Sequence, residues 1–195
     1  MAKLYFRYGA MNSGKSTAVL QVAFNYEERG MRVLVLKPSI DTKGNDLIVS
    51  RLGATRKVDV LATPDLDLFA SISQWNKDVE KIHCILADEA QFFTPSQVEQ
   101  LLRITVHLGI PVICYGIRTD FQTKLFPGSM RLFELAHSFE ELKTICRCGK
   151  KALFNGRKLN GQFVFKGSQV AIDGQDDVAY ESLCADCYTH LSELS

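Results

Sequence analysis

The stretch that decides the fold reads Gly9-Ala10-Met11-Asn12-Ser13-Gly14-Lys15-Ser16-Thr17. It satisfies the pattern G-x-x-x-x-G-K-[ST], and it joins a predicted strand over residues 4–8 to a predicted helix over residues 16–29. In this context the glycines let backbone N–H groups curl around phosphates, Lys15 reaches the β- and γ-phosphates, and the Ser16 hydroxyl ligates Mg²⁺. The stretch therefore predicts a site for a nucleoside triphosphate, formed by Gly9, Ala10, Met11, Asn12, Ser13, Gly14, Lys15 and Ser16.

The residues around this stretch alternate short apolar runs with amphipathic helical patterns as far as residue 140. Further strands are predicted over residues 32–36, 83–87 and 111–115, and further helices over 65–75 and 95–108, the last with Thr94 as its N-cap. Such alternation is typical of a parallel sheet. We therefore expect an α/β fold over residues 1–140, a P-loop NTPase domain of the RecA-like type with helices flanking a parallel sheet.

The pattern changes near residue 141. From there on, glycines separate short alternating segments such as 161–166 and 169–172, which predict antiparallel strands. Residues 141–195 are therefore expected to form a second, smaller domain, and the cysteines described next predict that it is of the zinc-ribbon type.

Four of the six cysteines lie in this last part of the chain, as a Cys-x-Cys and a Cys-x-x-Cys pair. Two close pairs a few dozen residues apart fit a tetrahedral four-thiolate zinc site, and an ATP-using protein without a signal peptide works in a reducing compartment, where disulfides are rare. Four protein ligands leave no open position, so such a zinc ion is structural. The expected ligands are Cys146, Cys148, Cys184 and Cys187, whereas Cys84 and Cys114 lie in apolar runs and are expected to be buried hydrophobes.

An acidic pair follows the predicted strand 83–87. Asp88 is expected at the carboxyl edge of the sheet, where it would hold Mg²⁺ directly or through water. Glu89, one residue later, could polarise a nucleophile. If that nucleophile is water, the protein is an NTPase, and if it is a substrate hydroxyl, the protein is a kinase.

Composition excludes several classes of protein. The chain has 195 residues, of which 46% are hydrophobic and 23% charged, as in an average globular protein. Its 23 Lys and Arg against 22 Asp and Glu give no net field that would attract nucleic acid or an anionic membrane. No apolar run is long enough to span a bilayer, and no signal peptide is evident. We expect a soluble, cytoplasmic protein without nucleic-acid or membrane partners.

Two other functions compete with a kinase. A nucleic-acid motor with a zinc ribbon would carry a basic C-terminal part, but residues 141–195 hold seven Lys and Arg against seven Asp and Glu, a difference of zero. A regulatory GTPase would carry an Asn-Lys-x-Asp motif after a strand, and the sequence has none.

Four blocks in this order and spacing resemble the thymidine kinases of the cytosolic, zinc-containing type, with bacterial members the most similar. The blocks are residues 10–17, Asp88-Glu89-Ala90-Gln91-Phe92-Phe93, Tyr115-Gly116-Ile117-Arg118-Thr119-Asp120-Phe121, and the two cysteine pairs. The resemblance implies transfer of the ATP γ-phosphate to the 5′-hydroxyl of thymidine to give dTMP for DNA synthesis, and it leaves open how far deoxyuridine is also phosphorylated. It also implies a homotetramer.

The resemblance also implies roles for single residues. Glu89 would be the general base, Arg51 would lie over the phosphates, and Asp88, Glu89, Ala90 and Gln91 would lie at the nucleotide site. Met11, Phe121 and Tyr180 would surround the base, although Phe121 also fits a plain core aromatic. Arg118 receives no definite role. A lasso over the nucleoside would begin with Gln169, Val170, Ala171, Ile172 and Asp173, and the segment 173–179 is longer and more acidic than in the family.

Overall fold

A six-stranded parallel sheet forms the centre of the computed structural model, which describes residues 1–40, 46–78, 81–169 and 178–194. Every pair of neighbouring strands is parallel. The strand before the Gly9 stretch and the strand before Asp88 lie on either side of the strand over residues 112–117. The Gly9 stretch and Asp88 therefore lie at the same edge of the sheet. The strand order is β5 (Val60–Ala62), β2 (Val33–Pro38), β6 (Cys84–Ala87), β7 (Val112–Ile117), β1 (Leu4–Gly9) and β8 (Ser138–Glu141).

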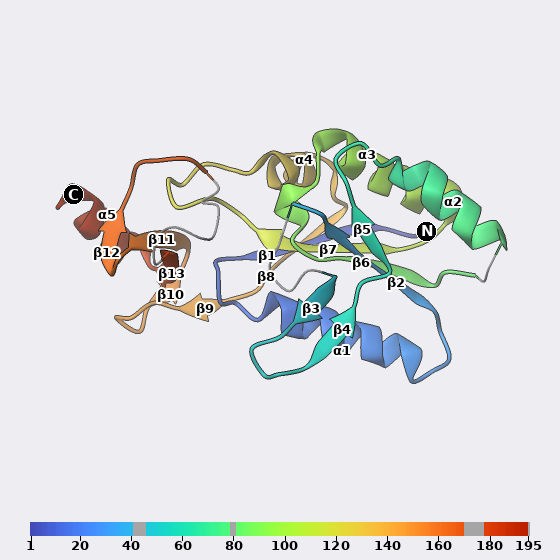
Figure 1. Ribbon diagram of the computed structural model, residues 1–195, viewed down its shortest axis with the longest axis horizontal. Helices are drawn as coiled ribbons and strands as arrows, with labels where there is room; N and C mark the ends of the chain where they lie inside the picture. The colour runs from blue at the N-terminus through green and yellow to red at the C-terminus, as the bar shows by residue number, and fades with distance from the viewer. Residues whose placement is uncertain (41–45, 79–80, 170–177, 195) are drawn as a thin grey trace.

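Helices cover both faces of this sheet, which confirms the expected α/β class. Figure 1 shows α1 (Lys15–Glu27) on one face and α2 (Leu68–Asp78), α3 (Pro95–Arg103) and α4 (Pro127–Leu135) on the other. Alternate residues of β2 point to the two cores: Val35 packs with Val19 of α1, whereas Leu34 packs with the other helices. Among the described helices none is long and apolar enough to cross a membrane.

Local signals explain where the helices begin and end. Thr94 caps α3 in a capping box with Gln97, as its sequence predicts. The predicted helix over 95–108 is divided, because the α-helical part ends at Arg103 and a π-helical segment, η2 (Ile104–Leu108), continues it. The predicted helix over 65–75 instead begins at Leu68, since the Asp67 side chain accepts the Ala70 N–H at 2.9 Å.

The chain after β8 forms small antiparallel sheets beyond one end of the central sheet (Figure 1). A hairpin of β9 (Thr144–Ile145) and β10 (Lys151–Ala152) precedes a three-stranded sheet. The strand order in that sheet is β12 (Gln162–Val164), β11 (Phe154–Leu159) and β13 (Val178–Leu183). Of the predicted strand over 161–166 only 162–164 is a strand, and of 169–172 only Gln169 is described. The remaining elements are α5 (Ala185–Glu193) and a hairpin of β3 (Leu47–Val49) and β4 (Thr55–Lys57) packed near α1.

Candidate active site and metal centre

The loop between β1 and α1 has the curled backbone that phosphate binding needs. Asn12 and Gly14 have φ of 65° and 77°, in the left-handed region, so the chain turns sharply before α1. Lys15 is only 9% exposed, and its Nζ donates to the Ala10 carbonyl at 2.8 Å and to Ser13 Oγ at 3.3 Å. The lysine therefore lies along the inside of the loop, which we call the phosphate loop (residues 9–16).

The phosphate loop and the acidic pair border one small pocket. Its lining includes Ser16, Asp88 and Glu89, together with the residues of β3. Lys37, at the end of β2, also lines it and is 2% exposed. The sequence gives no signal for Lys37, because it appears only as one polar residue within an apolar run. The pocket thus joins one hydroxyl, two carboxylates and a buried cation.

Gln91 fixes the direction of the Glu89 side chain. Glu89 has φ 47° and precedes the short helix η1 (Ala90–Phe92). The Gln91 Nε2 donates to Glu89 Oε2 at 2.6 Å, while the Gln91 Oε1 accepts the Ile117 N–H at 3.1 Å. Because only the amide oxygen can accept from a backbone N–H, the amide nitrogen must face Glu89. The sequence placed Gln91 at the nucleotide site, and its side chain points to the expected base.

The two arginines that the sequence singled out contact different parts of the chain. Arg51 is exposed and donates to the Asn12 side-chain oxygen, which brings it beside the loop. Arg118 instead donates to the Leu153 carbonyl at 3.4 Å and lies 5.7 Å from the Phe154 ring centre. Arg118 therefore faces the three-stranded sheet of β11, β12 and β13, which we call the C-terminal sheet.

Side chains from the C-terminal sheet and from β9 form hydrogen bonds with the phosphate loop. Asn155 of β11 accepts the Met11 N–H at 2.7 Å and donates to the Thr119 carbonyl at 2.9 Å. Ser182 of β13 donates to the Met11 carbonyl, and the Thr144 hydroxyl donates to the Asn12 carbonyl at 3.3 Å. Sequence reasoning missed these residues, since their partners in the phosphate loop are more than 130 positions away.

Three of the residues expected around a nucleoside, Phe121, Tyr180 and Gln169, lie next to Arg157, which the sequence did not indicate. Phe121 follows β7 and is 1% exposed, and the Arg157 guanidinium carbon lies 3.6 Å from its ring centre. Tyr180 pairs with Arg157 between β13 and β11. Gln169 donates from its side chain to buried Asp120 at 3.0 Å. The other lasso residues named above, Val170, Ala171, Ile172 and Asp173, lie outside the described residues.

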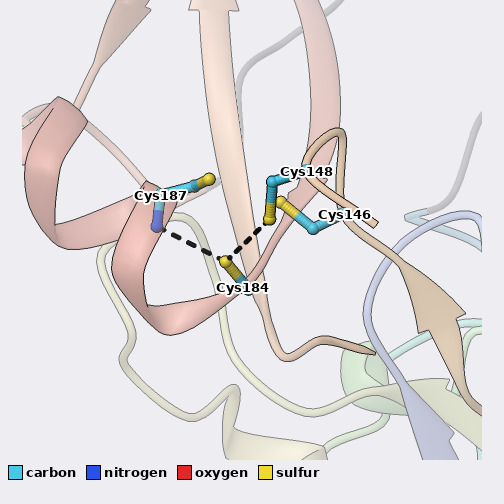
Figure 2. A group of neighbouring side chains, drawn as sticks. All are labelled: Cys146, Cys148, Cys184 and Cys187. Carbon is cyan, nitrogen blue, oxygen red and sulfur yellow. Dashed lines mark hydrogen bonds between the residues drawn. The ribbon is translucent and has the colours of Figure 1, made fainter. Parts of the chain in front are cut away.

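The four paired cysteines meet in one cluster, and their sulfurs all lie within 4.8 Å of one another (Figure 2). Cys146 and Cys148 come from the β9–β10 turn, and Cys184 and Cys187 from the start of α5. Four sulfurs about 2.3 Å from a tetrahedral zinc ion would lie about 3.8 Å apart. The donor set and its spacing therefore fit a tetrahedral metal ion with thiolate ligands.

The thiols of this cluster influence each other's ionisation. Burial opposes ionisation of Cys146, but the backbone N–H groups of Cys148 and Cys184 lower its pKa to about 7. Hydrogen bonds with Cys148, Cys146 and Cys184 raise the pKa of Cys187 to about 12. Thiolates this close repel one another, and a bound cation would remove that repulsion. By contrast, burial raises the pKa of Cys84 to about 11 in the central core.

The whole sequence is similar to proteins of one family. A family model described as thymidine kinase matches residues 2–188. The thymidine kinase of Legionella pneumophila (strain Paris) is 47% identical over 192 residues, covering 97% of this chain and 89% of the relative. That of Enterobacteria phage T4 is 45% identical over 197 residues, covering 100% and 98%. That of Pasteurella multocida (strain Pm70) is 49% identical over 187 residues, covering 94% and 95%.

Proposed function

The chain belongs to the thymidine kinase family, and from this premise we propose that it transfers the γ-phosphate of ATP to the 5′-hydroxyl of thymidine, giving dTMP and ADP. One observation supports the chemistry most directly: Glu89 lines the same small pocket as Ser16 of the phosphate loop. A carboxylate beside bound phosphates is what a kinase needs to activate a substrate hydroxyl.

The phosphate loop binds and orients ATP in this proposal. Its backbone N–H groups surround the phosphates, Lys15 neutralises their charge, and Arg51 lies over them from beside Asn12. Ser16 and Asp88 would hold Mg²⁺, whose charge would offset that of the phosphates. Phosphoryl transfer requires little covalent chemistry from a protein, so positioning and neutralisation are the main contributions of these residues.

Glu89 acts as the general base. Its carboxylate accepts the proton of the 5′-hydroxyl while that oxygen forms a bond to the γ-phosphorus. The bond between the γ-phosphorus and the β–γ bridging oxygen breaks, and ADP leaves with the electron pair. Ala90 and Gln91 complete this side of the site, and Gln91 keeps the carboxylate directed by its 2.6 Å hydrogen bond.

The nucleoside lies between the two parts of the chain, a nucleotide-binding domain of residues 1–140 and a zinc-binding domain of residues 141–195. Met11, Phe121 and Tyr180 surround the base, and the backbone of Gln169–Asp173, of which only Gln169 is described, hydrogen-bonds to it. The bound metal of the cysteine cluster is zinc and is structural, since four thiolates leave no open position. We further propose that the enzyme acts in the cytoplasm, forms a homotetramer and binds no nucleic acid.

An ATP-consumption assay with a panel of nucleosides tests this function. Thymidine and deoxyuridine should be phosphorylated, with thymidine preferred by about 10- to 100-fold because one methyl group in an apolar pocket gives only modest selectivity. Purine and ribonucleosides should be rejected. ATP hydrolysis without a nucleoside, or its stimulation by DNA, would contradict the proposal.

Glu89→Gln gives a first prediction about single residues. The amide cannot accept the proton, so kcat should fall on the order of a hundredfold or more, while both KM values remain close to those of the wild type. Glu28→Gln, at the exposed end of α1, is a matched control that should leave kcat unchanged. Steady-state kinetics with each substrate varied in turn measures both, and a near-normal kcat for Glu89→Gln would exclude it as the base.

A further inference from the structure

Three residues expected at the nucleoside make contact with Arg157, to which the sequence assigns no role. Its guanidinium carbon lies 3.6 Å from the ring centre of Phe121 and 5.9 Å from that of Tyr180. One of its terminal nitrogens donates to the backbone carbonyls of Ser168 at 2.6 Å and Gln169 at 3.1 Å. A single side chain thus links the loop after β7, the strand β13 and the segment after β12.

Fold stability alone does not account for an arginine in this position. Arg157 is only 4% exposed, and it forms no ion pair with any carboxylate that the structure describes. Its Nε is buried, with no hydrogen-bond partner among the described residues. Burying a cation and an unpaired donor costs free energy that a methionine or leucine would not incur. Carbonyl dipoles and the aromatic faces offset only part of that cost.

The strand that carries Arg157 also contacts the phosphate loop. Asn155 and Arg157 are two residues apart on β11, so their side chains lie on the same face of the strand. Asn155 bonds to Met11, while Arg157 contacts Phe121, Tyr180 and the backbone of Gln169. This one face therefore touches every described residue that is proposed to surround the nucleoside.

We propose that Arg157 is a positioning residue that holds Phe121, Tyr180 and the Gln169 backbone in the arrangement that binds thymidine; the inference rests on the proposed function. A planar guanidinium can stack on a ring and donate to two carbonyls at once, which neither a lysine nor an apolar residue can do. Arg157 contacts no residue of the ATP pocket described above, so its role concerns thymidine and not ATP.

The test compares Arg157→Met, Arg157→Lys and wild type by steady-state kinetics with ATP, Mg²⁺ and thymidine. Arg157→Met keeps an unbranched apolar side chain against Phe121 but donates no hydrogen bond. It should raise the thymidine KM about tenfold or more and leave the ATP KM within about twofold. Arg157→Lys should give a smaller selective rise, because it keeps the cation but not the planar stack. Arg131→Met, which removes a half-buried arginine paired with Glu99 and Glu134, is the control and should change neither KM.

The outcomes separate this inference from the proposed function. A wild-type protein that does not phosphorylate thymidine overturns both. An active wild type with an unchanged thymidine KM in folded Arg157→Met overturns the role of Arg157 alone, and so does an equal rise in both KM values. If Arg157→Met lacks the wild-type circular dichroism spectrum, Arg157→Lys decides, and the absence of a selective rise in its thymidine KM overturns the inference.

Discussion

At the scale of single residues, Glu89 has a backbone conformation that is uncommon for a residue with a side chain. Its φ of 47° lies in the left-handed region, which costs roughly 1 kcal/mol or more for a non-glycine residue. The Asp88 side chain accepts the Glu89 N–H at 3.0 Å, and Gln91 fixes its carboxylate. The direction of the proposed base is therefore set by its neighbours before any substrate binds.

Gln91→Leu tests that arrangement. Loss of the amide leaves the Glu89 carboxylate free to rotate, so kcat should fall about tenfold or more while both KM values stay within about threefold. Gln100→Leu is a matched control, since Gln100 also accepts a backbone N–H, that of Leu68, but lies away from Glu89. If both variants lose kcat equally, general destabilisation explains the effect, and Gln91 does not position the base.

The sequence predicted Glu89 better than it predicted Gln91. A carboxylate one residue after the metal-binding acid can be recognised from the sequence as a candidate general base. The function of the Gln91 amide depends on its contact with Ile117, which lies 26 residues away at the end of β7, and no local pattern indicates that contact.

At the scale of elements, α4 packs against η1 backbone to backbone. A Cβ built at Gly128 would lie 2.6 Å from the Ala90 carbonyl oxygen, 2.7 Å from that of Phe93 and 2.8 Å from that of Gln91. A methyl group here has no space, and the obstructing atoms are main-chain carbonyls that cannot rotate away. The position of η1, which carries Gln91, therefore depends on the absence of a side chain at position 128 of α4.

Gly128→Ala should displace η1 and so affect both stability and catalysis. We expect a loss of about 1 to 3 kcal/mol in the free energy of unfolding and a fall in kcat. Gly30→Ala is the control, because its φ of 68° strains an alanine by about 1 kcal/mol while no atom lies near the new methyl group. It should lower stability without lowering kcat. Urea unfolding and the kinase assay measure the two quantities, and an unchanged kcat in Gly128→Ala would contradict the expected displacement.

The elements that sequence analysis missed share a physical cause. The four predicted strands of the central sheet are buried apolar runs, and all four exist. By contrast, α4 begins with Pro127 and Gly128, a dipeptide that indicates a turn when only local propensity is considered. The strand β5 has only three residues, β8 has one apolar residue among four, and both lie at the sheet edges, so neither shows an apolar pattern that indicates a strand.

At the scale of the whole molecule, the six cysteines fall into two classes with different environments. Cys84 and Cys114 are fully buried in the central sheet, and burial raises the pKa of Cys84 to about 11 and that of Cys114 further. The other four form two pairs that are far apart in sequence, and they meet in one cluster in the C-terminal part. Only the pairing pattern in the sequence indicated that they would meet. The sequence predicted both classes, because cysteine spacing and apolar context are local signals.

Removal of the metal should distinguish the two classes. In the metal-loaded protein at pH 8, no thiol should react quickly with a disulfide reagent, and elemental analysis should find about one zinc per chain. After chelation the segments that carry the cluster lose the ion that joins them, so its four thiols should become accessible and react, while Cys84 and Cys114, fully buried in the central sheet, react only in denaturant. Thymidine binding should weaken on chelation before the central sheet unfolds. Four fast thiols in untreated protein without zinc would contradict the metal centre.

The hydrogen bonds between the C-terminal sheet and the phosphate loop have a consequence for how the chain folds during its synthesis. Met11 obtains its partners from Asn155 and Ser182, 144 and 171 residues further along the chain. All six strands of the central sheet lie within the chain up to Glu141, the last residue of β8. On the ribosome, all six strands can therefore pair while the loop between β1 and α1 still lacks these partners. A nascent chain therefore completes its central sheet first and its phosphate loop last. Translation products that end between these two stages would contain a folded central sheet but no activity.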